Sequence, residues 1–508
     1  MPAKLFSAAT LGLESELVEV EVDAFNTGMH HFTVVGLPDT TIKESRDRVS
    51  SAIKNSGFLP PHRFGRITVN LAPADLPKNT PVYDVPMALG FLLATEQLNF
   101  DFRDKLFVGE LSLDGKVRPI SGILPIALLA KRLGFTELYV PEKNAAEASM
   151  IRDVTVIPIT SLFDTARHLS KANTIAPHPD IDMESLFQEE TFLLDMKDVR
   201  GQEHAKRALE IAAAGGHNIL MSGPPGSGKT VLAKTLPSIL PKLNFEESIE
   251  ITKIFSIAGF LTRGNTLVTA RPFRSPHHSA SAVSLVGGGS FPRPGEISLA
   301  HRGVLFLDEF GEFSKNVLEN LRQPLEDGHI TVSRAKGSLH FPARFILVAA
   351  MNPCPCGNLG DPERLCSCSP RETARYKTRI SGPIMDRIDL HIEVPRVPFD
   401  KLEAPGDAER SLDIRARVER ARDIQRKRFE GKGIFTNAEM NSALLREICP
   451  LDQAGKDLLR QAVSSMRLSA RAYYRLIKLA RTIADLETSD HITPTHLAEA
   501  VQYRFKTE

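Results

Sequence analysis

One stretch of the sequence has the residue types and the spacing that bind nucleotide phosphates. The pattern G-x-x-x-x-G-K-T is formed by Gly223, Pro224, Pro225, Gly226, Ser227, Gly228, Lys229 and Thr230. Its glycines permit backbone conformations in which successive N–H groups point at phosphate oxygens. Lys229 can reach the β- and γ-phosphates, and the Thr230 hydroxyl can ligate Mg²⁺. A glycine-rich turn that matches by accident is the alternative. The apolar run before this phosphate loop and the helical pattern after it favour binding of ATP and Mg²⁺.

Two carboxylates follow a second apolar run of the chain. Residues 303–307 have the composition of a buried strand, and Asp308 and Glu309 come directly after it. In a parallel sheet, this strand would end at the same edge as the phosphate loop. We expect Asp308 to hold Mg²⁺, directly or through water, and Glu309 to activate the attacking water as a general base. A neighbouring buried strand at 345–350 would place Asn352 where its amide senses the γ-phosphate.

Four of the five cysteines lie close together in the sequence, as Cys354, Cys356, Cys366 and Cys368. Two close pairs of thiolates can bind Zn²⁺ in tetrahedral geometry, and four protein ligands leave no open position for catalysis. We therefore expect a structural zinc site. Unligated reduced thiols and an iron–sulfur cluster are the alternatives. The fifth cysteine, Cys449, lies in a helical context and is expected in a core.

Several segments are locally basic although the net charge of the whole chain is only +1. The segment 259–303 contains five arginines and one glutamate, together with the flexible run Gly287–Gly289. A predicted hairpin after it is also basic near its tip. Such segments can grip the phosphates of single-stranded or branched DNA, whereas a solvated loop or a subunit contact is the plain alternative. The candidate DNA contacts are Arg271, Arg274, His277, His278, Arg293, Arg334 and Lys336.

Composition excludes several classes of protein. Apolar residues make up 42% of the 508 residues and charged residues 25%, which is typical of a globular protein of several domains. No apolar run approaches the about 20 residues that span a bilayer. The N-terminus lacks the features of a secretory signal, so we expect a cytoplasmic protein without a membrane partner.

The patterns predict an α/β protein with four parts along the chain. These are an α/β domain at 1–170, a linker at 171–194, a nucleotide-binding core with a parallel sheet at 195–398 and a helical region at 399–508. Three features are predicted within the core: the basic insertion 259–303, the hairpin 329–345 and the four-cysteine loop 354–368.

The first domain resembles the proteolytic domain of Lon proteases through Gly109–Ile120 and Leu71–Lys78. Lon proteases use a Ser–Lys dyad. At the position that matches the serine this chain has Val82, and the stretch that matches the lysine contains Leu124, Pro125 and Ile126. Without a nucleophile and a base the mechanism cannot run, so we expect a non-proteolytic domain used in assembly or DNA contact.

The whole chain resembles the magnesium-chelatase-like AAA+ proteins of the ComM (YifB) type. The similar motifs include Arg271–His278, Pro292–Ser298, Asn352–Gly357 and Ser381–Leu390. The resemblance implies a homo-hexameric, ATP-driven DNA motor. It also implies branch migration or helicase activity in homologous recombination during natural transformation, with a recombinase and other recombination proteins as partners.

The resemblance to AAA+ motors also assigns two arginines. Arg387, which precedes a strand, is the first candidate for an arginine supplied in trans to the γ-phosphate, with Arg379 as the alternate. Arg471 opens a helix of the predicted lid, where a second sensor arginine would contact the phosphates, and Arg475 is the alternate. A helix-end arginine paired with a neighbouring aspartate is the structural alternative for Arg387.

Two other functions remain open at this point. The chain could be the motor subunit of a metal chelatase, or an ATPase that remodels proteins. Chelatase motors are not expected to carry the Lon-like region or the four-cysteine loop. Protein-threading pores usually display an aromatic–apolar loop, whereas the insertion here offers arginines.

Overall fold

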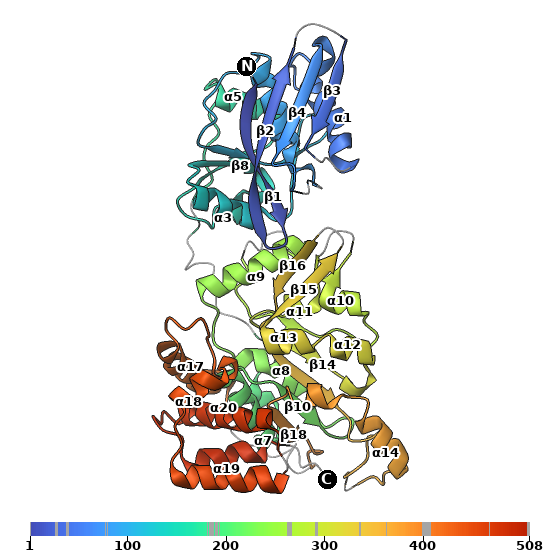
Figure 1. The fold of residues 1–508 in the computed structure, drawn as a ribbon, viewed down its shortest axis with the longest axis vertical. Helices are drawn as coiled ribbons and strands as arrows, with labels where there is room; N and C mark the ends of the chain where they lie inside the picture. Colours follow the sequence, from blue (N-terminus) through green and yellow to red (C-terminus); the bar gives the residue numbers. More distant parts are fainter. Residues whose placement is uncertain are drawn as a thin grey trace. The chain divides into compact units, whose positions relative to one another are not determined.

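The computed structural model describes residues 2–25, 29–36, 40–76, 78, 80–179, 181, 187, 192, 194–261, 267–289, 293–334, 337–361, 363–398, 408–466 and 468–504. The chain forms two compact units. The first consists of Met1–Gln188 together with Ser248–Thr269, and the second of Glu189–Glu247 together with Ala270–Glu508. Figure 1 shows that both units combine helices with sheets, so the predicted α/β class is confirmed.

The first unit is built on a mixed seven-stranded sheet with the order β3-β4-β2-β1-β5-β8-β9. The long strands β1 and β2 pair antiparallel, whereas β5, β8 and β9 run parallel. The strand bounds are Ala3–Leu11 (β1), Glu14–Ala24 (β2), His31–Val35 (β3), Arg66–Ala72 (β4), Lys105–Phe107 (β5), Glu137–Pro141 (β8) and Thr155–Ile159 (β9). A small ribbon pairs β6 (Glu110–Leu111) with β7 (Val117–Arg118).

Helices cover this sheet with apolar faces. The helix bounds are Thr40–Asn55 (α1), Asp84–Ala94 (α2), Ile123–Leu133 (α3), Ala145–Ala148 (α4) and Leu162–Leu169 (α5). Helix α2 is almost wholly buried because its sequence is apolar on all sides. Val82 lies just before α2, and Leu124, Pro125 and Ile126 lie in α3; all four side chains are buried. The positions that match the Lon dyad therefore belong to the apolar interior of this unit.

The first unit also includes a segment from the middle of the chain. Helix α9 (Phe245–Ala258) begins in the second unit, and its later residues belong to the first. Ile249 and Leu267 are buried in the same cluster as the side chains of α3. Ser256 donates a hydrogen bond of 2.7 Å to the carboxylate of Glu147. Part of the segment predicted as a DNA-gripping insertion is thus a structural component of the first unit.

The second unit is built on a five-stranded parallel sheet with the order β11-β14-β17-β10-β18. The strand bounds are Ile219–Ser222 (β10), Phe273–Arg274 (β11), Val304–Leu307 (β14), Ile346–Met351 (β17) and Leu390–Glu393 (β18). Strands β14 and β17 are buried along their whole length. Buried central strands are expected where helices cover both faces of a parallel sheet.

Helices surround this sheet and form a lid after it in the sequence. Those of the core are Glu203–Gly215 (α7), Lys229–Ile239 (α8), Ala282–Val286 (α10), Glu296–Leu299 (α11), Lys315–Glu319 (α12), Arg322–Asp327 (α13), Pro370–Lys377 (α14) and Gly382–Met385 (α15). Those of the lid are Ser411–Arg428 (α17), Ser442–Ile448 (α18), Gln453–Met466 (α19), Ala470–Leu486 (α20) and Pro494–Gln502 (α21). In Figure 1 the helices α17 to α20 lie together on one side of this unit.

The lid shares one hydrophobic core with the sheet. Ile414 and Val418 of α17 are buried in the same cluster as Ile219 of β10 and Leu232 of α8. Helix α17 is highly charged, but one of its faces is buried in this way. Cys449 is buried in the same core, as expected.

The second unit also contains two antiparallel two-stranded ribbons. Strands β12 (Gly287–Gly288) and β13 (Arg293–Pro294) pair antiparallel within the basic insertion. Strands β15 (His329–Arg334) and β16 (Gly337–Pro342) form the predicted hairpin. Among the described residues, no helix is both long enough and apolar enough to cross a membrane.

Candidate functional site

The phosphate loop connects strand β10 to helix α8, in the order that the sequence predicted. Gly226 and Gly228 have φ angles of +79° and +92°, which favour glycine. Lys229 is buried, and its Nζ donates hydrogen bonds to the carbonyl oxygens of Gly223 at 2.7 Å and Pro224 at 2.9 Å. Burial lowers the pKa of Lys229 from its usual value. The N-terminus of α8 and this ammonium group together suit the phosphates of a nucleotide.

Two hard oxygen ligands lie beside the loop. The Thr230 hydroxyl donates a hydrogen bond of 2.8 Å to Oδ2 of Asp308, which follows β14. The two residues meet because parallel strands β10 and β14 end at the same edge of the sheet. Mg²⁺ at a nucleotide is held by one or two protein oxygens together with phosphates and waters. Thr230 and Asp308 therefore fit the ion that the phosphate loop requires.

Glu309, the candidate base, has an unusual backbone conformation and a partner that the sequence did not indicate. Its φ angle is +51°, and its N–H donates to Oδ1 of Asp308 at 2.9 Å. Its carboxylate lies 2.9 Å from Nδ1 of His278 and is 56% exposed. His278 was expected to contact DNA, but the structure places it against the carboxylate that would activate water.

Two amide side chains complete the edge of the sheet where the loop lies. Oδ1 of Asn352 lies 3.4 Å from Nζ of Lys229, and its role as a sensor of the γ-phosphate stays a prediction. The Gln202 side chain donates to the carbonyl oxygens of Pro395 at 2.5 Å and Ser227 at 3.4 Å. Gln202 therefore contacts the phosphate loop from the segment before α7.

Arg387 and Arg471 lie together, bound to one carboxylate. Both guanidinium groups pair with Glu326 of α13, Arg471 at 3.3 Å and Arg387 in closer contact. Arg387 is buried and also donates to the carbonyl of Pro383 at 2.7 Å. The alternate residue Arg475 pairs instead with buried Asp389. Arg379, the other alternate, pairs with Glu312 at the surface at 2.7 Å.

This arginine pair lies near the amino ends of the parallel strands, whereas the phosphate loop follows the carboxyl end of β10. Arg387 precedes β18, whose last residue Glu393 pairs in register with Ser222 at the start of the phosphate loop. Four residues of strand span about 13 Å. Glu326 and Arg471 line a cavity of about 680 Å³, which is also lined by residues at or before the first residues of β10, β14, β17 and β18. Neither arginine can therefore reach the phosphate loop of its own chain.

Among the described candidates for DNA contact, some are paired with carboxylates and others are exposed. Arg271 pairs with Glu247 at 3.0 Å, and Arg274 makes a two-pronged pair with Glu296 at 2.6 and 2.7 Å. Each of these two guanidinium groups is paired with a carboxylate of the same unit, and a role for either arginine in DNA contact stays a prediction. Arg293 of β13 is exposed.

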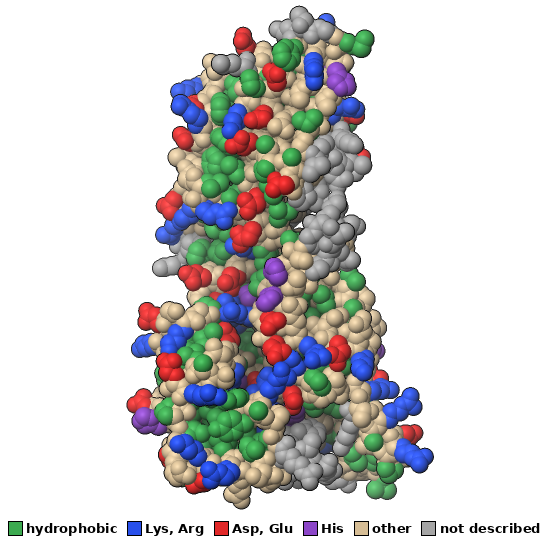
Figure 2. Space-filling model, in the orientation of Figure 1, with side chains coloured by type: hydrophobic (Ala, Val, Ile, Leu, Met, Phe, Trp, Pro, Cys, Tyr) green, Lys and Arg blue, Asp and Glu red, His purple; other side chains and the backbone are tan. Residues whose placement is uncertain are grey.

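The other predicted DNA contacts are His277, Arg334 and Lys336. His277 is exposed, and its ring centroid lies 4.1 Å from that of His278. The side chain of Arg334 and the whole of Lys336 lie outside the described residues. Figure 2 shows basic and acidic side chains interspersed on the face that it draws, so DNA binding would depend on local contacts.

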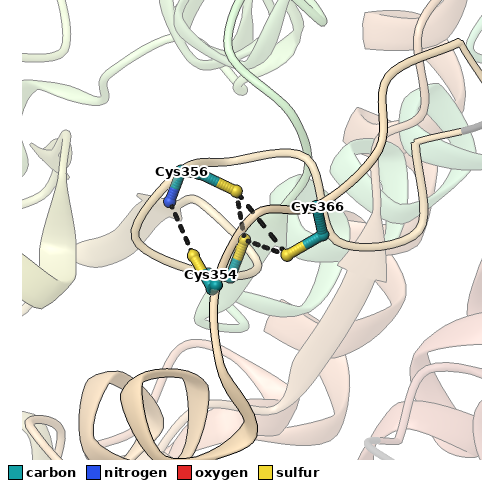
Figure 3. Close-up of side chains that lie close together, drawn as sticks. Cys354, Cys356 and Cys366 are labelled. Carbon is teal, nitrogen blue, oxygen red and sulfur yellow. Dashed lines mark hydrogen bonds between the residues drawn. The ribbon is translucent and has the colours of Figure 1, made fainter.

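The four cysteines converge as the zinc prediction requires. The sulfur of Cys354 lies 3.4 Å from that of Cys356 and 3.7 Å from that of Cys366, and all four lie within 4.8 Å of one another. Figure 3 shows the sulfurs of Cys354, Cys356 and Cys366 pointing toward one another. Ligands at about 2.3 Å from one tetrahedral ion are about 3.8 Å apart. Backbone N–H groups of Asn358 and Ser367 hold the pKa of Cys356 below its usual range.

The chain matches three families along its length. Residues 195–402 match the family described as magnesium chelatase, subunit ChlI; residues 18–144 match subunit ChlI of Mg-chelatase; and residues 408–504 match magnesium chelatase, subunit ChlI C-terminal. These three matches cover the phosphate loop, most of the first unit and the lid.

Individual proteins are also similar to the chain. It is 45% identical to competence protein ComM of Haemophilus influenzae, over 99% of this chain and 97% of the relative. It is 44% identical to protein YifB of Escherichia coli, over 98% of this chain and 96% of the relative. Lon protease 2 of Bacillus subtilis is 28% identical over 27% of this chain and 26% of its own length.

Proposed function

Because the chain belongs to the magnesium-chelatase-like AAA+ family that includes ComM and YifB, we propose that it is an ATP-driven DNA motor. In this proposal it assembles as a homo-hexamer in the cytoplasm and promotes branch migration in homologous recombination during natural transformation. Membership of the AAA+ family implies an ATPase that uses ATP and Mg²⁺. A role of the motor in natural transformation is suggested by a full-length relative that is a competence protein.

One observation carries the motor part of the proposal: the proposed nucleotide-binding residues and the two proposed arginines lie at opposite ends of the strands of one sheet. Lys229, Thr230 and Asp308 meet at one edge, and Arg387 and Arg471 meet at the other. Such an arrangement suits a ring in which the arginine edge of each subunit faces the phosphate loop of the next. Head-to-tail contacts of this kind close into rings.

Each residue has a defined task in this proposal. Lys229 binds the β- and γ-phosphates, and Thr230 and Asp308 hold Mg²⁺, which neutralises phosphate charge. Glu309 accepts a proton from the attacking water. Arg387 and Arg471 of the neighbouring subunit stabilise the negative charge that develops on the transferred group.

The proposed DNA surface uses the exposed part of the insertion and the two ribbons. Arg293 is exposed at the end of the β12–β13 ribbon, and His277 is exposed before α10. From the sequence alone, Arg334 and Lys336 at the tip of the hairpin are added to this surface. Single-stranded and branched DNA are the proposed substrates, and a recombinase is a proposed partner.

The four-cysteine cluster is proposed to hold a structural Zn²⁺. The sulfur separations match one tetrahedral ion, whereas an iron–sulfur cluster would distribute its thiolates over several irons. Metal analysis of protein purified without chelator should give about one zinc per chain. Protein without zinc would exclude this site.

The ATPase rate with and without DNA, across a salt series, tests the proposed function. Strong stimulation by single-stranded and branched DNA that fades as salt rises is expected, because phosphate contacts release counterions. Normal basal hydrolysis without stimulation would refute the DNA motor. It would favour a chelatase subunit or a protein-remodelling ATPase.

A further inference from the structure

We propose that the metal held by the four cysteines fixes the conformation of the phosphate loop, so that metal occupancy sets nucleotide affinity. The inference concerns Gly357 in the cysteine loop (Cys354–Cys368) and Pro225 in the phosphate loop, which lie in direct contact. It rests on the proposed zinc site and the proposed ATP site, and adds a connection between them.

The cysteine loop begins at the edge of the sheet where the nucleotide would bind. Cys354 is buried and follows Asn352 by two residues, at the end of β17. The backbone N–H of Gly357 donates to the carbonyl of Cys354 at 3.0 Å, which closes a tight turn around the first two ligands. The backbone N–H of Cys356 donates to the sulfur of Cys368 at 3.3 Å, which ties the two cysteine pairs together.

The turn packs directly on the phosphate loop. Gly357 is buried and has a φ angle of +81°. A Cβ atom at this position would lie 2.6 Å from Cδ of Pro225 and 3.8 Å from Cγ of Asn352. The backbone of Gly357 therefore fills the space behind the phosphate loop, and no larger residue fits without moving Pro225. The turn at Gly357 thus helps to position both the phosphate loop and Asn352.

A second contact holds the far side of the cysteine loop. The carboxylate of Asp361 is fully buried and pairs with Arg396 at 2.8 Å. Arg396 follows β18, the strand that neighbours β10. The cysteine loop contains few apolar side chains and depends on its four sulfurs for cohesion. A single ion that binds all four would join Cys354, at the end of β17, to Cys368, just before helix α14.

Loss of the metal removes this cohesion. The turn at Gly357 would then sample other conformations, and Pro225 would lose the surface on which it packs. The phosphate loop binds through N–H groups whose directions must be set before the ligand arrives, and small misplacements of such groups are costly. Nucleotide affinity should therefore fall about tenfold or more when the metal is absent.

Two glycine variants of the full-length protein distinguish loss of the Gly357–Pro225 contact from a general disturbance of the cysteine loop. Gly357→Ala places a methyl group against Pro225, whereas Gly360→Ala has nothing within 4 Å of the added atom. Both glycines lie in the cysteine loop, with φ angles of +81° and +79°, so both substitutions carry the same backbone cost. Both variants should keep one zinc. We expect only Gly357→Ala to weaken binding of a fluorescent ATP analogue, by about tenfold.

Removal of the metal provides the second arm of the test. Cys366→Ser should lose zinc and bind the analogue at least about tenfold more weakly, while circular dichroism stays that of the wild type. Chelator-treated wild type should behave in the same way, and added Zn²⁺, but not added Mg²⁺, should restore its affinity. This reversibility excludes a general folding defect.

Distinct results overturn distinct claims. Unchanged nucleotide affinity in Cys366→Ser and in Gly357→Ala would refute the connection. An equal loss of affinity in Gly360→Ala would show that any disturbance of the loop suffices, and would refute the specific contact. Wild-type protein without zinc would refute the metal as the cause. Absence of ATP binding in zinc-loaded wild type would instead refute the proposed ATPase.

Discussion

Replacement of Arg387 by alanine should stop ATP hydrolysis and leave ATP binding intact. Arg387 lies about 13 Å from the phosphate-loop edge of its own sheet, by the length of β18. That separation exceeds the reach of an arginine side chain, so the variant keeps every contact of its own loop. Glu326 retains Arg471 at 3.3 Å after the change. An arginine that acts on the γ-phosphate contributes about 10³-fold or more to turnover.

Mixing experiments give a quantitative form of this prediction. In a ring, each site takes Lys229 from one subunit and Arg387 from its neighbour. When Lys229→Ala and Arg387→Ala subunits are mixed in equal amounts, about a quarter of the sites receive both intact residues, whatever the ring size. We therefore expect about a quarter of the wild-type ATPase rate from the mixture, although each variant alone is inactive. Two affinity tags would verify that mixed assemblies form.

Two results would refute the reasoning. A mixed assembly without activity would mean that Arg387 serves its own subunit or only supports the fold. A hydrolysis rate near that of the wild type in Arg387→Ala alone would remove the residue from the site. A mixture of Lys229→Ala with wild type serves as the control for dilution of active subunits.

Three further predictions concern single side chains. Glu309→Gln should bind ATP but hydrolyse it at least about 10²-fold more slowly, and normal turnover in a phosphate-release assay would exclude Glu309 as the base. His278→Ala should raise the ATPase rate without DNA severalfold, because the carboxylate of Glu309 loses the partner 2.9 Å away. His277→Ala is the matched control for this rate without DNA, and an equal rise in both variants would refute the role of His278. Burial lowers the pKa of His391 from 6.5 to about 4, so the unfolded chain takes up a proton before the folded chain as the pH falls. His391 alone should therefore lower the unfolding free energy by about 3 kcal/mol between pH 7 and pH 4. Urea denaturation should show a weaker pH dependence in His391→Gln, and an unchanged dependence would contradict this cause.

The sequence predicted the centre of the second unit well because local patterns determine it. The glycines of the phosphate loop, the apolar strand before Asp308 and the strand before Asn352 each identify their own element. The rule that parallel strands end at one edge then brings Lys229, Thr230 and Asp308 together, and the structure places them so.

Contacts between distant segments were not predictable in this way. His278 and Glu309 lie in contact, but no sequence motif indicates that these two residues are partners. The basic segment around His277 and His278 predicted DNA contact instead. Arg271 and Arg274 looked available because their partners, Glu247 and Glu296, are only identified by the fold.

Residues 248–269 belong to the first unit, so a single cut in the chain cannot divide this protein into its two units. Within the single helix α9 the chain crosses from the second unit to the first, and it returns near residue 270. A gene fragment that encodes only residues 189–508 would express Ile249 and Leu267 without the core that buries them. Exchange of the first unit between relatives must therefore transfer two separate stretches of the gene together, and a cut at the linker alone divides one folding module.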